Sequence, residues 1–303
     1  LGENGQYGTV RNAATVEGAT PDPDPENPNP KPDDPTGKDD EDTPTSIKLT
    51  ITAGSASKEY DGEPLTKDSY TSGQLAEGHK IDSVTITGSI TEVGSAPNKA
   101  SSAVIKAGEK DVTSHYEITY EDGTLKVTQN KTDATLHVEP YNDEYDAKPH
   151  SVRDENVTGA VAGTVWKYQY RTSENAEWSD TKPMFTDVTE ATVYVKASNA
   201  NYEDLKTSAT VTITQKPIEV YAEATRTYNG ADQTLEIIPG NGKTTVTGVV
   251  SGEILTLNGA KITGKNAGTY NELDGGNNNY TWNVTKEDKT TDSTGNYLIL
   301  VTG

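Results

Sequence analysis

A short tyrosine motif recurs three times along the chain and sets the length of its folding unit. In each copy a tyrosine is followed by an aspartate or asparagine and a small residue: Tyr60-Asp61-Gly62, Tyr145-Asp146-Ala147 and Tyr228-Asn229-Gly230. The tyrosines are 85 and 83 residues apart. A second tyrosine follows later in each copy, in His115-Tyr116, Asn201-Tyr202 and Asn279-Tyr280. Two motifs in the same order at near-constant spacing predict three tandem modules.

Between these motifs, apolar residues alternate with polar ones over short stretches. Ile47, Leu49 and Ile51 form one such stretch, and Val211 with Ile213 belongs to another. A period of two is typical of strands with one buried face. Turn-forming pairs such as Asp122-Gly123 separate the stretches, and no segment has a convincing helical period. The sequence therefore predicts an all-β fold of three immunoglobulin-like β-sandwich modules, each of about 85 residues.

The first module carries the clearest resemblance to a known family. Its Tyr60-Asp61-Gly62 opening, its Val93-Gly94 pair, its Asp111–Tyr116 run and its ending at Gly123–Val127 resemble the MBG or "YDG" bacterial immunoglobulin-like repeats. The later modules resemble related repeats, so the likeness extends over residues 46–303. It implies modules used as stalks or for adhesion on a cell-surface or secreted bacterial protein. It implies no catalytic residues.

The prolines and acidic residues concentrate before the first module and predict a linker. Residues 21–45 hold 8 of the 15 prolines, with nine acidic residues against two lysines. Such a segment remains extended because proline cannot complete a ladder and like charges repel. We read residues 1–20 as a disordered end or the tail of an upstream module. The three modules are expected at 46–129, 130–216 and 217–303, joined by short links as a semi-rigid rod.

The charge and cysteine content restrict the partners and the compartment. A net charge of −21 disfavours binding to nucleic acid or to an anionic membrane surface. No run of apolar residues is long enough to insert into a membrane. The chain has no cysteine, which excludes disulfides and thiolate metal sites. We expect a monomeric, extracellular segment on a bacterial surface or in a secreted protein, of Gram-positive type by association.

No constellation for catalysis or cofactor binding emerges from the sequence. The four histidines lack metal-ligand spacing, and neither a nucleophile elbow nor a phosphate loop occurs. The acidic run Asp39–Asp42 lacks the glycine and glutamate spacing of a calcium loop. We therefore predict a non-enzyme with no catalytic residues, no metal site and no cofactor.

The second module holds the concentrated aromatics, which are the candidate ligand contacts. Trp166, Tyr168 and Tyr170 alternate, so a strand places them on one face, and Trp178 follows eight residues later. The favoured interpretation is that this face is the core of the module, as for the central tryptophan of many sandwiches. The alternative is an exposed platform on which sugar rings stack.

These observations favour an adhesion stalk and interaction module. Two alternatives remain open. One is a dedicated binder of a host protein, such as an immunoglobulin, or of a glycan, through the second or third module. The other is a set of accessory modules belonging to a larger secreted enzyme.

Overall fold

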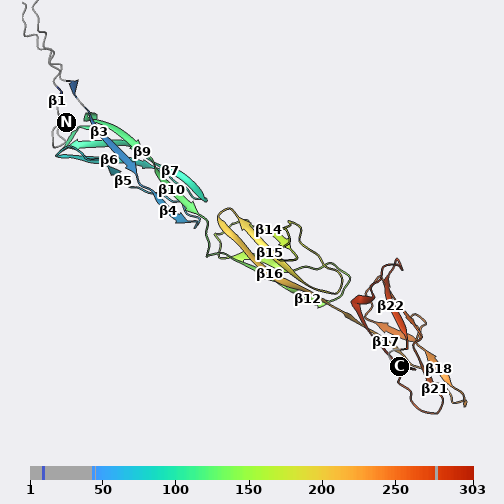
Figure 1. Cartoon of the computed structure of the whole chain (residues 1–303). Helices are drawn as coiled ribbons and strands as arrows, with labels where there is room; N and C mark the ends of the chain where they lie inside the picture. Colours follow the sequence, from blue (N-terminus) through green and yellow to red (C-terminus); the bar gives the residue numbers. More distant parts are fainter. Residues whose placement is uncertain (1–8, 11–42, 45, 277–278) are drawn as a thin grey trace, which may run out of the picture. The chain divides into compact units, whose positions relative to one another are not determined.

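A computed structural model describes residues 9–10, 43–44, 46–276 and 279–303 (Figure 1). These residues form strands joined by turns, with two single-turn 3₁₀ helices at Thr113–His115 (η1) and Thr294–Asn296 (η3) among the named elements. The predicted all-β class with tandem sandwich modules is confirmed. The chain divides into two compact units, residues 1–130 and 131–303, which we describe separately.

The predicted tail and linker lie almost wholly outside the described residues. Within them the structure describes one short antiparallel pair, Thr9–Val10 (β1) with Thr43–Pro44 (β2). The extended state predicted for the linker and the rod-like arrangement of the three modules stay predictions.

The first unit contains module 1, in which two sheets enclose one core. One sheet has the strand order β5-β3-β9, and the other has β4-β10-β7-β6 with β8 beside β7. The strands are β3 (Ile47–Ala53), β4 (Ala56–Glu59), β5 (Tyr70–Ser72), β6 (His79–Thr87), β7 (Gly94–Ala107), β8 (Lys110–Asp111), β9 (Tyr116–Glu121) and β10 (Gly123–Thr128).

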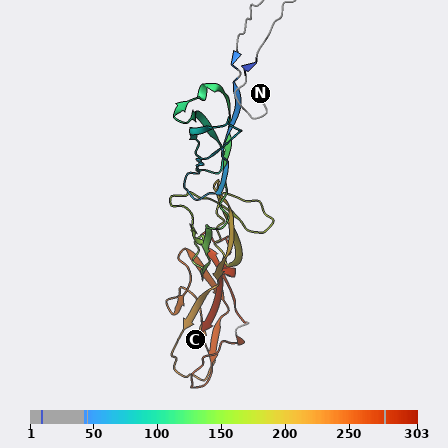
Figure 2. The same ribbon diagram turned by 90° about the vertical axis from the view of Figure 1, so that its left-hand side faces the viewer.

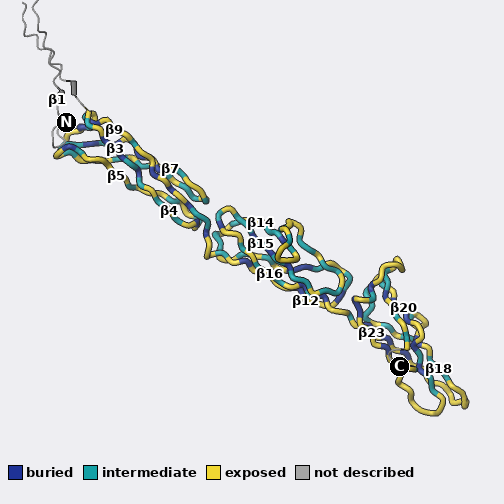
Figure 3. The backbone as a smooth tube through the Cα atoms, in the orientation of Figure 1, coloured by how far each residue is buried: buried dark blue, intermediate teal, exposed yellow. Residues whose placement is uncertain are grey.

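The predicted alternation defines this core. Leu49 and Ile51 of β3 are buried and belong to one core cluster with Ala103 and Ile105 of β7, whereas Thr50 is exposed. Figure 3 shows the same alternation of buried and exposed residues along the strands. Burying an aliphatic side chain stabilises the fold by roughly 1.5–3 kcal/mol, so these positions contribute most to the unit's stability.

The second unit contains modules 2 and 3. In module 2 a four-stranded sheet, β12-β16-β15-β14, accompanies the pair β11-β13. In module 3 the sheet β19-β17-β23 accompanies the pairs β18-β21 and β20-β22. The strands of module 2 are β11 (Thr135–Glu139), β12 (Tyr141–Glu144), β13 (Arg153–Thr158), β14 (Lys167–Arg171), β15 (Thr189–Asn199) and β16 (Tyr202–Thr214). Those of module 3 are β17 (Lys216–Ala222), β18 (Gln233–Glu236), β19 (Thr244–Thr247), β20 (Glu253–Asn258), β21 (Lys261–Gly264), β22 (Thr281–Lys286) and β23 (Tyr297–Thr302).

The two modules of this unit are continuous in chain and in core. Only Gln215 separates β16 from β17, and the ribbon passes directly from one strand to the next (Figures 1 and 2). A single cluster of buried residues includes Val193 and Val211 of module 2 together with Ile218 and Tyr297 of module 3.

Strand register corrects the predicted alignment of module 3. In module 1, β9 runs parallel to β3 with Tyr116 opposite Ile47. In module 3, β23 runs parallel to β17 with Tyr297 opposite Lys216. Tyr297 is therefore the counterpart of Tyr116, and the prediction that gave this role to Tyr280 was wrong.

The correction changes the identity of the last strand as well. Residues 295–299 therefore do not correspond to the ending of module 1 at Gly123–Val127, because β23 corresponds to β9. The dipeptide Asn-Tyr occurs twice in this module, at 279–280 and 296–297, and its spacing alone favoured the first copy. Tyr280 precedes β22, which pairs with β20 much as the end of β7 pairs with β6.

Candidate functional site: an inter-module clamp and an aromatic–cationic face

The recurrent tyrosine motif forms the same local turn in all three modules. The side-chain oxygen of Asp61 accepts a hydrogen bond from the backbone N–H of Glu63 at 2.9 Å. Asp146 does so from Lys148 at 2.9 Å, and Asn229 does so from Ala231 at 3.0 Å. An aspartate or asparagine whose side chain closes a turn two residues on explains why these residue types follow the tyrosine.

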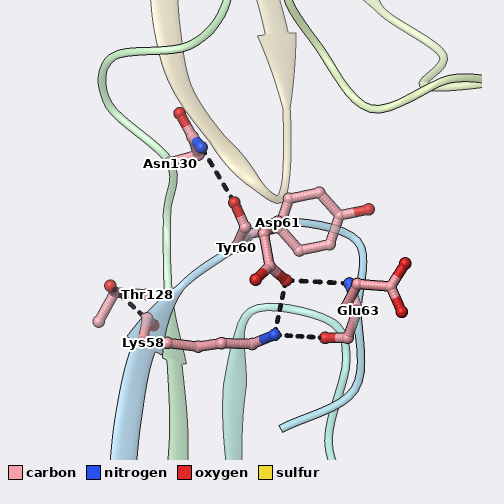
Figure 4. A network of polar contacts seen from close by, with 6 residues as sticks. All are labelled: Lys58, Tyr60, Asp61, Glu63, Thr128 and Asn130. Atoms are coloured by element: carbon pink, nitrogen blue, oxygen red, sulfur yellow. Dashed lines mark hydrogen bonds and ion pairs between the residues drawn. The ribbon is translucent and has the colours of Figure 1, made fainter.

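In module 1 this turn anchors the end of the sandwich (Figure 4). Lys58 donates to the Asp61 carboxylate at 2.6 Å and to the Glu63 carbonyl at 2.7 Å. The Asn130 side chain donates to the Tyr60 carbonyl at 3.0 Å, and the Tyr60 N–H donates to the Thr128 carbonyl at 2.9 Å. The motif therefore ties the end of β4 to the end of β10.

In module 2 the corresponding tyrosine reaches into module 3. Tyr145 is fully buried, and its hydroxyl donates to one oxygen of the Glu253 carboxylate at 2.7 Å. Tyr297 donates to the other carboxylate oxygen. The two tyrosine rings meet edge to face, with centroids 5.4 Å apart and planes at 78°. One carboxylate therefore joins two buried tyrosines, one from each module.

Asn296, beside Tyr297, makes a second set of bonds across the same boundary. Its side-chain oxygen accepts the Val188 N–H at 2.8 Å, and its amide nitrogen donates to the Asp187 carboxylate at 2.9 Å. Asn296 is 6% exposed, so both bonds are sheltered from water. We call the five residues Tyr145, Asp187, Glu253, Asn296 and Tyr297 the clamp.

Gln215, the residue between the two modules, adds hydrogen bonds at this boundary. The Gln215 side chain donates to the carbonyls of Gly295 and Tyr297, each at 3.1 Å. Buried polar groups that are all paired specify one arrangement, since any other leaves them unsatisfied. The clamp and Gln215 thus fix how module 3 attaches to module 2.

The clamp shifts the ionisation of its tyrosines. Burial, followed by the hydrogen bond to Glu253, raises the pKa of Tyr145 to about 12. Burial and the bond to Glu253 also raise the pKa of Tyr297 well above its ordinary value. A phenolate at either position would be desolvated and would face a carboxylate, so both hydroxyls remain protonated donors.

The predicted aromatic cluster divides between two faces of module 2. Trp166, Tyr168 and Tyr170 pack against the core, and the Trp166 ring lies 5.1 Å from the Tyr202 ring. This agrees with the core interpretation for these three. Trp178 lies instead on the outer face of the sheet. Its neighbours there are side chains of strand residues that alternate with the buried ones.

On that outer face Trp178 contacts cations. The Arg171 guanidinium lies 4.4 Å and the Lys196 ammonium 5.1 Å from the centroid of the indole ring. Arg171 also lies 5.3 Å from the Tyr194 ring. Trp178 is half-buried, so part of its ring is open to solvent. Sequence reasoning identified Trp178 but missed Arg171 and Lys196, although β-strand alternation places both residues on its face.

Three of the four histidines make structural contacts with neighbouring side chains. His79 hydrogen-bonds the Tyr116 hydroxyl at 2.8 Å, and His137 bonds Thr158 at 3.0 Å. His150 bonds Asp146 at 2.7 Å and stacks on Tyr141 with centroids 4.2 Å apart. Within the described residues, no group of three or more His, Cys, Asp or Glu side chains is placed to hold a metal ion.

Among the described residues, no helix has the length and apolar character needed to cross a membrane.

The fold and the clamp define the chain as a tandem array of β-sandwich modules with a polar inter-module boundary. Its sequence matches no family model and no curated protein, so the MBG resemblance stays a prediction. Among solved structures the chain is similar to Drosophila N-cadherin EC1-3, with 13% identity over 85% of this chain and 98% of that one at a TM-score of 0.23. Drosophila N-cadherin EC1-4 shares 7% identity over 80% and 72% of the chains, with a TM-score of 0.23. The protocadherin GammaB4 extracellular domain shares 12% identity over 86% and 48%, with a TM-score of 0.26. At these scores we draw no functional argument from the likeness.

Proposed function

We propose that the chain is a non-catalytic segment of a bacterial surface or secreted protein that acts as an adhesion stalk and interaction module. The clamp is the observation that supports this proposal. A stalk transmits position only if its modules resist bending at their junctions, and a junction held by several buried hydrogen bonds resists bending. The resemblance to bacterial surface repeats supports the extracellular setting.

Two spin labels test whether the clamp holds modules 2 and 3 in one arrangement. Because the chain has no cysteine, the exposed residues Thr210 and Thr256 can be replaced by cysteine and labelled specifically. We expect a single narrow distribution of distances between the labels in the full chain. The double variant Glu253→Ala, Asn296→Ala should broaden it at least twofold, since both sets of bonds are lost.

The matched control is Glu236→Ala, which removes an exposed acid of module 3 outside the clamp. This control should keep the narrow distribution. A distribution that is already broad in the unmodified chain would contradict the stalk proposal, whatever the variants do.

The outer face of module 2 supports a second candidate function, a binder of a glycan or a host protein. An indole in contact with an arginine and a lysine offers an aromatic surface beside hydrogen-bond donors, in a chain whose net charge is −21. Exposed aromatic rings flanked by donors suit sugars and the side chains of protein partners.

Replacing Trp178 by alanine tests this candidate. A screen of the full chain against host glycans and secreted host proteins, immunoglobulins included, would identify a ligand. The substitution should then weaken its binding at least tenfold, the usual size of an aromatic contact at the centre of an interface. Replacing Trp166, which packs in the core, by phenylalanine should change affinity little. A ligand bound equally well by the Trp178 variant would exclude this face.

A further inference from the structure

The outer face of module 2 brings three cations together through strand register. Strands β14, β15 and β16 lie side by side in one sheet (Figure 1). Arg171 of β14 lies opposite Tyr194 of β15. Two residues further along β15, Lys196 lies opposite Lys206 of β16. Because residues two apart on a strand point to the same side of the sheet, these four side chains share one face.

A short segment beside β14 adds Trp178 to this face. The backbones of Tyr170 and Ser179 exchange two hydrogen bonds, at 2.8 and 2.9 Å, as an antiparallel bridge. Trp178 therefore lies beside Arg171, whose guanidinium is 4.4 Å from the centroid of the indole ring. On the neighbouring strand, the Tyr194 ring lies 5.3 Å from the same guanidinium. We define the cationic face as Arg171, Trp178, Tyr194, Lys196 and Lys206.

Acidic side chains neutralise the cationic face only in part. In the part of the chain that the structure describes, no ion pair involves Arg171 or Lys206. Lys196 pairs with Asp204 at 3.9 Å, a long distance for an ion pair. Asp180 pairs at 3.0 Å with a lysine outside the face. Positive charge therefore accumulates here in a chain whose net charge is −21.

Two features of the cationic face are unfavourable without an anion. Lys196 and Lys206 are directly opposite each other on antiparallel strands, where like charges destabilise a sheet. The Nε atom of Arg171 is buried and has no hydrogen-bond partner among the described residues, which also costs free energy. An anion on this face offsets the repulsion between the lysines and gives the guanidinium an acceptor.

Hydroxyl groups continue the same face along β15 and β16. Ser208 lies opposite Tyr194, and Thr210 lies opposite Thr192. Both Ser208 and Thr210 are exposed. A hydroxyl donates and accepts hydrogen bonds, as the hydroxyls of a sugar do, whereas a lysine or arginine only donates. The outer face thus combines donors for an anion, two aromatic rings and groups suited to sugar hydroxyls.

We propose that the cationic face binds a sugar ring that carries a carboxylate. The planar fork of the Arg171 guanidinium pairs with both oxygens of a carboxylate, and the two lysines add charge beside it. The indole of Trp178 offers an apolar surface to the C–H groups of the sugar. The proposal rests on the second candidate function above and goes beyond it by naming the charge and the class of the ligand.

A polyanion is a poorer ligand for this face than an acidic sugar. The chain carries a net charge of −21, so it repels an acidic peptide or a nucleic acid the more strongly, the more charges that ligand carries. A short glycan with few carboxylates meets little of this repulsion. It also uses the hydroxyls of Ser208 and Thr210 as both donors and acceptors, whereas acidic side chains only accept.

Isothermal titration of the full chain with two acidic sugars tests the proposal. Sialyllactose presents the carboxylate of a sialic acid, and a hyaluronan tetrasaccharide presents that of a glucuronic acid, so the two probes distinguish the sources. We expect saturable binding of at least one of them, with a dissociation constant in the millimolar range or below. Lactose and the carboxyl-reduced tetrasaccharide should bind at least tenfold more weakly, because they lack the charged acceptor. Higher ionic strength should weaken binding of the acidic sugar.

Three single substitutions assign the binding to the cationic face. Arg171→Gln removes the guanidinium and should weaken binding at least tenfold. Lys206→Gln changes an exposed side chain, which keeps the fold, and should weaken binding about threefold. Lys126→Gln is the control: it makes the same change of charge at an exposed strand position of module 1, opposite Ser95, and should leave binding unchanged. Tryptophan emission checks that the two variants of module 2 remain folded.

The outcomes separate this proposal from the broader one. Binding of neither acidic sugar, equal binding of the neutral sugars, or an equal loss in the Lys126 variant would overturn it. Saturable binding of an acidic peptide in place of the sugars would overturn it too, by assigning the face to another class of partner. A neutral ligand that depends on Trp178 but not on Arg171 would overturn the acidic sugar while leaving the binder function of this face intact.

Discussion

Replacement of Glu253 by alanine is expected to lower the free energy of unfolding of residues 131–303 by about 2–4 kcal/mol. Glu253 accepts hydrogen bonds from Tyr145 and Tyr297, whose side chains are 0% and 1% exposed. A hydrogen bond to a charged group contributes about 1.5–3 kcal/mol, and its removal leaves a buried hydroxyl without a partner. Losing the bond to Tyr145 also removes one of the links between modules 2 and 3.

Chemical unfolding followed by tryptophan emission measures this loss in the full chain. All three tryptophans, Trp166, Trp178 and Trp282, lie in the second unit, so the signal is specific to it. Glu253→Gln keeps an acceptor and should cost less than the alanine variant. Glu236→Ala, on an exposed position of the same module, should cost no more than about 0.5 kcal/mol. If Glu253→Ala behaved like Glu236→Ala, the clamp would have no energetic role.

Modules 1 and 3 share a buried tyrosine whose hydroxyl accepts a backbone N–H, and the comparison shows what Glu253 adds to it. Tyr116, the counterpart of Tyr297, accepts the Ala76 N–H at 3.1 Å, as Tyr297 accepts the Val250 N–H at 3.1 Å. In module 1 the tyrosine hydroxyl bonds His79, at the start of β6. Glu253 occupies the same place at the start of β20. Because a carboxylate has two oxygens, Glu253 accepts a bond from Tyr297 through one of them and from Tyr145 of module 2 through the other.

The sequence predicted the parts of this architecture that depend on local pattern. The alternation in Ile47–Ile51 defines β3, because a strand with one buried face must repeat every second residue. Turn-forming pairs were predicted to separate the strands, and Asp61-Gly62 and Asn229-Gly230 do so because the Asp61 and Asn229 side chains close a turn through a backbone N–H two residues on. The alignment of module 3 failed because an Asn-Tyr pair carries no information about which β-strand it begins.

The clamp could be predicted only in part for a related reason. Tyr145 belongs to the recurrent motif, and Asn296-Tyr297 matches the second motif once the register is known. Nothing in the sequence marks Glu253 among 47 acidic residues, because its role depends on a partner 108 positions away. The alternation of Trp166, Tyr168 and Tyr170 was enough to predict that they share one face of a strand. The cations beside Trp178 could not be predicted in this way, because Arg171 belongs to β14 and Lys196 to β15.

Raising the pH above 10 is expected to destabilise the second unit strongly. The pKa of Tyr145 is raised to about 12 by burial and by Glu253, and the pKa of Tyr170 is raised to about 12 by burial and by Glu155. Burial raises that of Tyr297 as well. In the unfolded chain these tyrosines ionise near pH 10. Their contribution to stability is therefore fully present below pH 10 and is lost as the pH rises towards the folded-state values.

The magnitude follows from linkage. Each tyrosine that remains protonated in the fold but ionises in the unfolded chain reduces the free energy of unfolding by about 1.4 kcal/mol per pH unit. Tyr145 alone should account for about 2 kcal/mol between pH 10 and pH 12. Tryptophan emission should show the unfolding midpoint of the full chain falling steeply over this range, and phenolate absorbance should show a group of tyrosines that ionise only as the unit unfolds.

The variant Tyr145→Phe separates this ionisation from general alkaline damage. At pH 8 the variant should be less stable than the unmodified chain, because Glu253 has lost a donor. As the pH rises towards 12 that difference should shrink by about 2 kcal/mol and approach or cross zero, since phenylalanine cannot ionise in the unfolded state. A constant difference across the range would mean that Tyr145 ionises equally readily folded and unfolded, which is incompatible with a hydroxyl buried between two modules and bonded to a carboxylate.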